Sequence, residues 1–156
     1  MMTNHQSGNI PPLLKTSLEE YISYWQRIST RSIRLIEKIA HPNLRFVDPF
    51  NDVSGIDAFE DMLTKALGDL SQFKFKATDR AWGEDGHTAY VRWTVSLIAK
   101  GKKKEMILTG VSEITLSPDG KIMSHIDHWD SGTQFYLHLP IVGWIIRKII
   151  AKIGHS

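Results

Sequence analysis

The chain has 156 residues, 42% of them hydrophobic and 23% charged, which suits a single globular domain large enough to bury a core. Its net charge of +2 is small and its basic residues are scattered, so we expect no nucleic-acid partner. The absence of cysteine excludes disulfides, thiol catalysis and iron–sulfur clusters, and without a signal-peptide pattern or a run of about 18 apolar residues we expect a cytoplasmic protein.

The N-terminal part of the chain is predicted to hold a lead-in followed by helices. Residues 1–16 are polar and contain prolines, so we expect a flexible segment. Ser17 is placed to cap a helix, with Glu20 three residues on. Apolar side chains then recur at a spacing of three and four residues, which predicts a helix followed by a second helical stretch over 33–39. The apolar positions of the first helix are Leu18, Tyr21, Ile22, Trp25 and Ile28.

A short apolar run ends at Asp48, which precedes Pro49. Proline biases the preceding residue toward extended geometry, so Asp48 is predicted to lie at the end of a strand over 44–48. A carboxylate among apolar neighbours is a candidate proton carrier with a raised pKa. Alternatively, Asp48 opens a turn and accepts hydrogen bonds from backbone amides. Gly55 then opens a further helix, with the apolar positions of 59–70 on one face.

From residue 72 the apolar pattern alternates, which predicts strands over 72–77, 90–98, 106–116 and 122–129. Turn signals separate them; they are Glu84-Asp85-Gly86, Gly101 to Lys104 and Ser117-Pro118-Asp119-Gly120. The three lysines at 102–104 are predicted to lie in a solvated hairpin turn. Helices followed by hairpin-linked strands indicate an α+β fold, in which a curved antiparallel sheet carries helices on one face.

A C-terminal helix is predicted over 140–153, with one apolar face and with Arg147, Lys148 and Lys152 elsewhere on its surface. We expect this helix to pack on its own domain or on a partner subunit; alternatively, a basic amphipathic helix lies on a membrane surface, which we favour less. The predicted organisation is therefore a lead-in at 1–16, a domain at 17–138 and an amphipathic helix at 139–156.

The chain from Ser17 to Asp130 resembles the ketosteroid isomerase and SnoaL-like polyketide cyclase branch of the nuclear-transport-factor-2-like superfamily. The resemblance rests on a first helix with tyrosines, followed in order by these elements: Val47-Asp48-Pro49, Gly55, Thr94 to Leu97 with Gly101-Lys102, and Gly120 to Ile122 leading to Trp129. It implies a cone-shaped sheet wrapped around N-terminal helices and enclosing a pocket, and we expect a homodimer.

The resemblance also implies roles for individual residues. Asp48 matches the isomerase aspartate that shuttles a proton, and Tyr24 matches the tyrosine that donates to the enolate oxygen. Ser112 stands where the isomerases keep a second donor, a protonated aspartate. Asp127 resembles the acid of SnoaL-like cyclases and of limonene-epoxide-hydrolase relatives. The hydrolases also need an arginine, for which Arg92 is a weak candidate because it faces away from Trp93.

We therefore expect a pocket enzyme of isomerase or cyclase type, performing acid–base chemistry on a small hydrophobic molecule with a carbonyl or similar polar handle. The predicted catalytic residues are Asp48, Tyr24 and Asp127. The predicted substrate-binding residues are Phe46, Phe50, Trp93, Ser112, His125 and Trp129. Strand alternation puts only His125 and Asp127 of the last strand's acids and histidines on the pocket face, so no metal site is expected, and no cofactor. Alternatives are a non-catalytic ligand binder, a dimeric interaction module and epoxide-hydrolase-type water activation.

Overall fold

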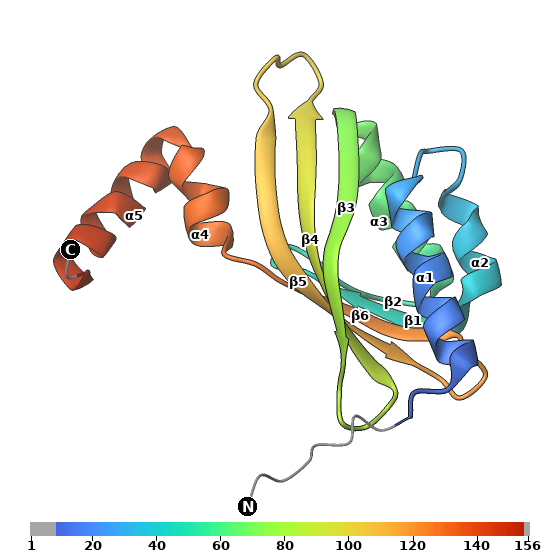
Figure 1. Cartoon of the computed structure of the whole chain (residues 1–156). Helices are drawn as coiled ribbons and strands as arrows, with labels where there is room; N and C mark the ends of the chain where they lie inside the picture. The colour runs from blue at the N-terminus through green and yellow to red at the C-terminus, as the bar shows by residue number, and fades with distance from the viewer. Residues whose placement is uncertain (1–8, 155–156) are drawn as a thin grey trace, which may run out of the picture.

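The computed structural model describes residues 9–154. A six-stranded, curved sheet with the strand order β2-β1-β6-β5-β4-β3 forms the body of the molecule. Helices α1, α2 and α3 gather on one side of this sheet, and a helical arm leaves its other side (Figure 1). The predicted α+β cone is therefore confirmed, with a sheet that curves without closing.

The four predicted hairpin-linked strands are present: the first two are longer than expected, the third has the predicted bounds and the fourth ends one residue earlier. They are β3 (Leu70–Trp82), β4 (Thr88–Ala99), β5 (Met106–Leu116) and β6 (Ile122–His128), all antiparallel to their chain neighbours. The turn before β6 holds Gly120 at φ 82°, a left-handed conformation that favours glycine. The predicted lysine turn between β4 and β5 is exposed.

The first two strands form one edge of the sheet. The sequence patterns did not predict how these strands pair. Strand β1 (Ala40–Val47) lies parallel to β6 and antiparallel to the short β2 (Asp52–Ser54). A parallel neighbour so distant in the chain leaves no local turn signal. This pairing brings the end of β1, and with it the loop that starts at Asp48, beside the end of β6.

The helices agree with the prediction except at the start of the chain and over residues 131–138, where two short helical elements were not predicted. Helix α1 (Pro12–Gln26) begins before Ser17, so the predicted cap is wrong; Pro12 suits a first helical position because the amide it lacks would be unpaired there. Residues 1–8 of the predicted lead-in lie outside the described residues. The remaining helical elements are η1 (Ile33–Leu35), α2 (Ile36–Ile39), α3 (Ile56–Gly68), α4 (Ser131–Gln134), η2 (Tyr136–His138) and α5 (Pro140–Ile153).

The core has two apolar clusters. The larger packs α1 against α3 and the sheet, with Tyr21 and Phe59 fully buried. The smaller consists of Trp93, Val95 and Leu108 on β4 and β5. Burying a large apolar side chain contributes about 1.5–3 kcal/mol, so both clusters stabilise the fold. Side chains of β3 pack against both clusters. Between these side chains and α3 a cavity remains.

Candidate functional site

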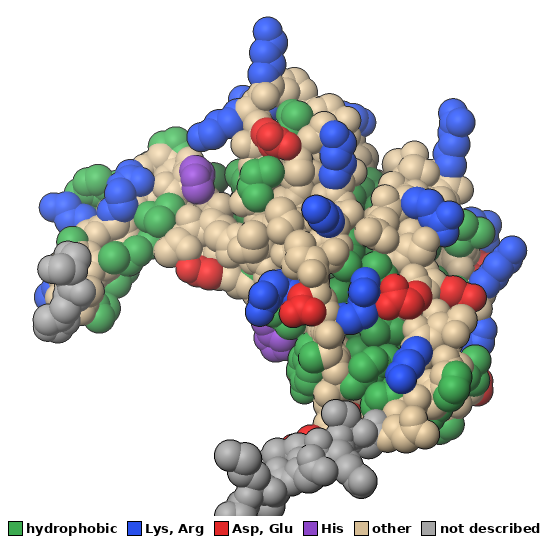
Figure 2. All heavy atoms as spheres, viewed as in Figure 1, with side chains coloured by type: hydrophobic (Ala, Val, Ile, Leu, Met, Phe, Trp, Pro, Cys, Tyr) green, Lys and Arg blue, Asp and Glu red, His purple; other side chains and the backbone are tan. Residues whose placement is uncertain are grey.

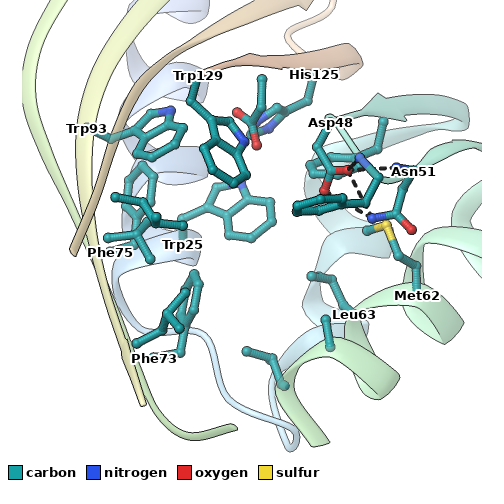
Figure 3. Close-up of a pocket in the computed structure, with 18 of the residues that line it drawn as sticks. Trp25, Asp48, Asn51, Met62, Leu63, Phe73, Phe75, Trp93, His125 and Trp129 are labelled. Atoms are coloured by element: carbon teal, nitrogen blue, oxygen red, sulfur yellow. Dashed lines mark hydrogen bonds and ion pairs between the residues drawn. The ribbon is translucent and has the colours of Figure 1, made fainter. Parts of the chain in front are cut away.

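A cavity of about 170 Å³ lies between α3, the inner face of β3 to β5, and the adjoining ends of β1 and β6. Figure 3 shows its walls, with Phe73, Phe75 and Trp93 on one side and Met62 and Leu63 on the other. Its polar side chains, apart from the indole nitrogens, are few: Asp48, Asn51, His125 and Asp127. The arrangement of an apolar wall with a few convergent polar groups is typical of a small-molecule site.

Strand β6 supplies the inner polar pair. Successive side chains of a strand point to opposite faces, and His125, Asp127 and Trp129 all line the cavity, as the alternation predicted. Phe46 of β1 lies opposite His125 in the parallel register, with the ring centroids 4.9 Å apart. His125 is 3% exposed, so its ring is held by aromatic packing in addition to its hydrogen bonds.

Tyr21, His125 and Asp127 form a hydrogen-bonded chain. The Tyr21 hydroxyl lies 2.7 Å from His125 Nδ1, and His125 Nε2 lies 2.7 Å from Asp127 Oδ1. An ionised carboxylate only accepts, so we assign the imidazole proton to Nε2, and the hydroxyl then donates to Nδ1. Burial raises the pKa of Tyr21 well above its ordinary value, which keeps this hydroxyl protonated. The chain holds the histidine in one tautomer.

Ser112 and Trp93 hold the same carboxylate from the neighbouring strands. Trp93 Nε1 donates to Ser112 Oγ at 2.8 Å, and Ser112 Oγ donates to Asp127 Oδ1 at 2.5 Å. Both hydrogen bonds to Asp127 therefore use Oδ1, and no group in residues 9–154 bonds to Oδ2. Asp127 is thus a firmly oriented carboxylate with one uncommitted oxygen in an apolar cavity.

The structure does not bring Tyr24 to the cavity. Its hydroxyl donates to the Ile33 carbonyl oxygen at 3.0 Å, and its side chain is absent from the cavity wall. Burial, together with the negative charge of Glu60, raises the pKa of Tyr24. The tyrosine that reaches the site, through His125, is Tyr21, one helical turn earlier. The resemblance assigned the role to Tyr24, whereas the hydrogen bond to the cavity histidine comes from Tyr21; the apolar pattern of the helix contained both.

Asp48 lines the cavity and also makes the predicted turn. Its Oδ1 accepts from the Phe50 and Asn51 amides, each at 2.7 Å, and the Asn51 side chain donates to both carboxylate oxygens at 3.0 and 3.1 Å. Figure 3 shows this pair facing the cavity across from Trp93. Asn51 was missed by the sequence prediction, although an amide two or three residues after an Asp-Pro pair is a natural turn partner.

The other predicted residues are divided between the wall and its support. Phe50 and Trp129 line the cavity, with ring centroids 5.7 Å apart. Ser112 is 1% exposed and lies behind the wall. Arg92 lies on the opposite face of β4, and no Lys or Arg among the described residues lines the cavity. Nor does the described part of the chain contain a cluster of three or more His, Asp or Glu side chains able to hold a metal.

Gly110 gives the Trp93 indole its place in the wall. A Cβ atom at Gly110 would lie 2.5 Å from the Trp93 ring and 2.8 Å from the His128 carbonyl oxygen. We expect Gly110→Ala to lower the free energy of unfolding by about 1–3 kcal/mol and to displace the indole from Ser112. Urea unfolding and near-ultraviolet circular dichroism measure the two effects. The matched control is Gly68→Ala, where nothing lies within 4 Å of the new methyl; equal stability of the two variants would contradict the prediction.

Comparison with solved structures gives the same fold repeatedly at low sequence identity. An NTF2-like protein of unknown function from Exiguobacterium sp. 255-15 is 20% identical, with a TM-score of 0.64 over 73% of this chain and 98% of the other. The epoxide hydrolase/cyclase-like enzyme SalBIII, which has a role in pyran ring formation in the polyether salinomycin, is 18% identical. Its TM-score is 0.64, over 77% of this chain and 92% of the other. An LEH-like epoxide hydrolase from M. tuberculosis is 13% identical, with a TM-score of 0.63 over 92% and 94%.

These identities are low, so the structural likeness shows the fold and leaves the reaction open. No curated protein matches the chain. The family model of the SnoaL-like domain matches residues 19–125, which run from helix α1 to His125 in β6. The match thus spans most of the body of the sheet and the helices that cover it, and the chain belongs to the SnoaL-like domain family.

Proposed function

We propose that the protein is an acid–base enzyme in which Asp127 exchanges a proton with a small apolar substrate carrying a carbonyl group. The observation that carries the proposal is the bonding of Asp127, with Oδ1 held by His125 and Ser112 and Oδ2 unbonded within residues 9–154. A general base must be oriented and still have a free lone pair toward the substrate, and Oδ2 meets this requirement.

The reaction is a proton shuttle. Oδ2 takes a proton from the carbon next to the carbonyl, which leaves an enolate, and the same carboxyl returns the proton to another carbon, so the substrate is isomerised and Asp127 is regenerated. The His125 Nε2–H bond to Oδ1 stabilises the carboxylate before it takes the proton and after it returns it; in between, Oδ1 is the carbonyl oxygen of the neutral acid and still accepts. We do not assign Asp48 as the base, because its carboxylate oxygens already accept hydrogen bonds from Asn51 and the loop amides. We assign it to the organisation of the cavity wall.

The size of the cavity supports a compact substrate. Its volume of about 170 Å³ is close to the engineered protein cavity of about 150 Å³ that binds benzene. A molecule with one ring and a carbonyl matches this volume, and we propose this class of substrate in place of a four-ring steroid. This differs from what the resemblance to steroid isomerases alone implies.

The second candidate function is ligand binding without chemistry, and the almost wholly apolar wall favours it. Two partly buried carboxylates argue against a pure binder, because a carboxylate in an apolar wall costs free energy unless it is paired or used. Asp48 is fully paired, but Asp127 is paired on one oxygen. The epoxide-hydrolase alternative lacks support from the site, since the candidate arginine Arg92 lies outside the cavity.

The test of the proposed function is proton exchange in D₂O. A panel of monocyclic ketones and unsaturated ketones is incubated with the wild-type protein, and deuterium uptake next to the carbonyl is followed by proton NMR. We expect exchange above the buffer rate for ring sizes that fit the cavity and none for a steroid ketone. If ligands bind, as seen by line broadening, but never exchange, the enzyme proposal is overturned and the second candidate function, ligand binding without chemistry, is supported.

A further inference from the structure

Helix α5 stands away from the body of the protein. The arm formed by α4 and η2 carries it outward from the end of β6, and it makes no layer with the sheet (Figure 1). Its direction is fixed at η2, where Arg147 donates to the Leu137 carbonyl oxygen at 3.1 Å. Gly143 packs so closely on the same carbonyl that a Cβ would lie 2.2 Å from its oxygen. The helix is therefore held in place at its start, and its remaining surface is left open.

The open surface of α5 is amphipathic. At about 100° per residue, a continuous arc of the helix is apolar, and the opposite arc carries Arg147 and Lys148, with Lys152 at the border. The apolar residues of the arc that are exposed are Val142, Ile145, Ile149, Ile150 and Ile153. Ile153 is 69% exposed and Ile149 51%. Contiguous aliphatic exposure of this kind marks an interaction surface.

The charge of this segment points to the nature of the partner. Residues 131–156 contain three basic side chains and no Asp or Glu, whereas acids slightly outnumber bases in the rest of the chain. Figure 2 shows the helix with basic side chains beside hydrophobic ones and no acid among them. A second copy of α5 could cover the apolar arc, but it offers no acidic side chain to the basic ones. An anionic phospholipid surface offers both the negative charge and the apolar layer that this helix matches.

The dimensions of α5 also suit a helix that lies in a membrane surface. Its 14 residues span about 21 Å, shorter than the bilayer core of about 30 Å. Within residues 9–154, no helix combines the length and hydropathy that crossing a bilayer requires. Trp144 is 57% exposed, and Lys148 Nζ lies 5.2 Å from the centre of its ring. Trp144 therefore lies on the basic side of the helix, and lysine can extend its charge toward the headgroups along its aliphatic stem.

We propose that α5 docks the protein on an anionic phospholipid surface, with its isoleucine face in the acyl boundary and its basic residues at the headgroups. The sequence favoured packing on its own domain or on a partner subunit; packing on the sheet of its own domain does not occur, because the arm directs the helix away from it. Phe135 of the arm packs on Phe50, a residue of the cavity wall, with ring centroids 5.2 Å apart, so the arm that carries the docking helix contacts the cavity wall. The inference is independent of the reaction at Asp127.

The test is co-sedimentation of the full chain with vesicles. One set contains phosphatidylcholine with phosphatidylserine, and the other contains phosphatidylcholine alone. We expect binding to the anionic vesicles that weakens with salt.

The double variant Ile149→Glu, Ile153→Glu should lose at least about tenfold in affinity, because it places two charges in the apolar arc. Lys148→Gln should weaken binding about fivefold and reduce the salt dependence. The matched control is Ile107→Glu, which is equally exposed, at 51%, but lies on β5.

Stability and oligomeric state complete the test of membrane docking. Thermal unfolding should be unchanged in the helix variants, since α5 does not contribute to the core. Equal binding to both vesicle types, or no binding to either, would overturn the proposal. The same holds if light scattering shows a dimer that the Ile149→Glu, Ile153→Glu pair converts to a monomer, because the apolar arc would then be covered by a second copy.

Discussion

Replacing Asp127 by Asn is expected to abolish the proton exchange of a substrate ketone, with a loss of about 10²- to 10⁴-fold in rate. The amide oxygen of Asn can still accept the hydrogen bonds of His125 and Ser112, so the fold and the apolar cavity should persist. An amide cannot act as a base at neutral pH, and so the effect should appear in kcat with little change in KM. Exchange kinetics by NMR, with ligand binding measured in parallel, separate the two.

The matched control is Asp48→Asn. Asparagine forms the same turn as aspartate, because its side-chain oxygen can accept from the Phe50 and Asn51 amides. We expect exchange in this variant to stay within a few-fold of wild type. If Asp48→Asn removed exchange and Asp127→Asn kept it, the base would be Asp48, and the assignment made from the hydrogen bonds would be wrong.

The second large effect is expected from Tyr21→Phe. The change removes the donor to His125 Nδ1 and leaves a buried acceptor unpaired, which costs about 1–3 kcal/mol of folding free energy. It also frees the imidazole tautomer that orients Asp127, so kcat should fall and the pH profile should change. We expect Tyr24→Phe to lower stability through the lost bond to the Ile33 carbonyl but to leave turnover unchanged. Urea unfolding and exchange kinetics on both variants test this contrast.

The same pair of variants predicts the response to alkaline pH. A tyrosine whose pKa is raised in the folded state contributes stability that is complete below its unfolded pKa of about 10 and is lost as the pH rises through the folded value. The free energy of unfolding of the wild type should therefore decline above about pH 10, and Tyr21→Phe should reduce that decline. Burial raises the pKa of Tyr24 in the same direction, so the variant lacking both hydroxyls should show the flattest curve. An unchanged slope in Tyr21→Phe would contradict the assignment of a buried, neutral hydroxyl.

Local sequence patterns were sufficient for most of the elements and for one face of the site, but not for β2, α4 or η2. Alternating side chains predicted β3 to β6, and the glycine turns predicted the hairpins that join them, because both depend on residues close in the chain. The same alternation correctly grouped His125, Asp127 and Trp129 on the cavity side. The C-terminal helix was predicted with its observed bounds, since its period and its flanking residues are also local signals.

Contacts between distant parts of the chain were decided by the tertiary structure alone. The parallel pairing of β1 with β6 places Phe46 against His125, and no turn or period announces it. Which tyrosine serves the site depends on how far α1 is rotated over the sheet, so Tyr21 reaches His125 and Tyr24 does not. Whether α5 packs on its domain or points away depends on the arm between them. The sequence thus indicated the family, strands β3 to β6 and the cavity face on which Asp127 lies. The hydrogen-bond partners of Asp127 and the open face of α5 were set by long-range packing, which local propensity does not encode.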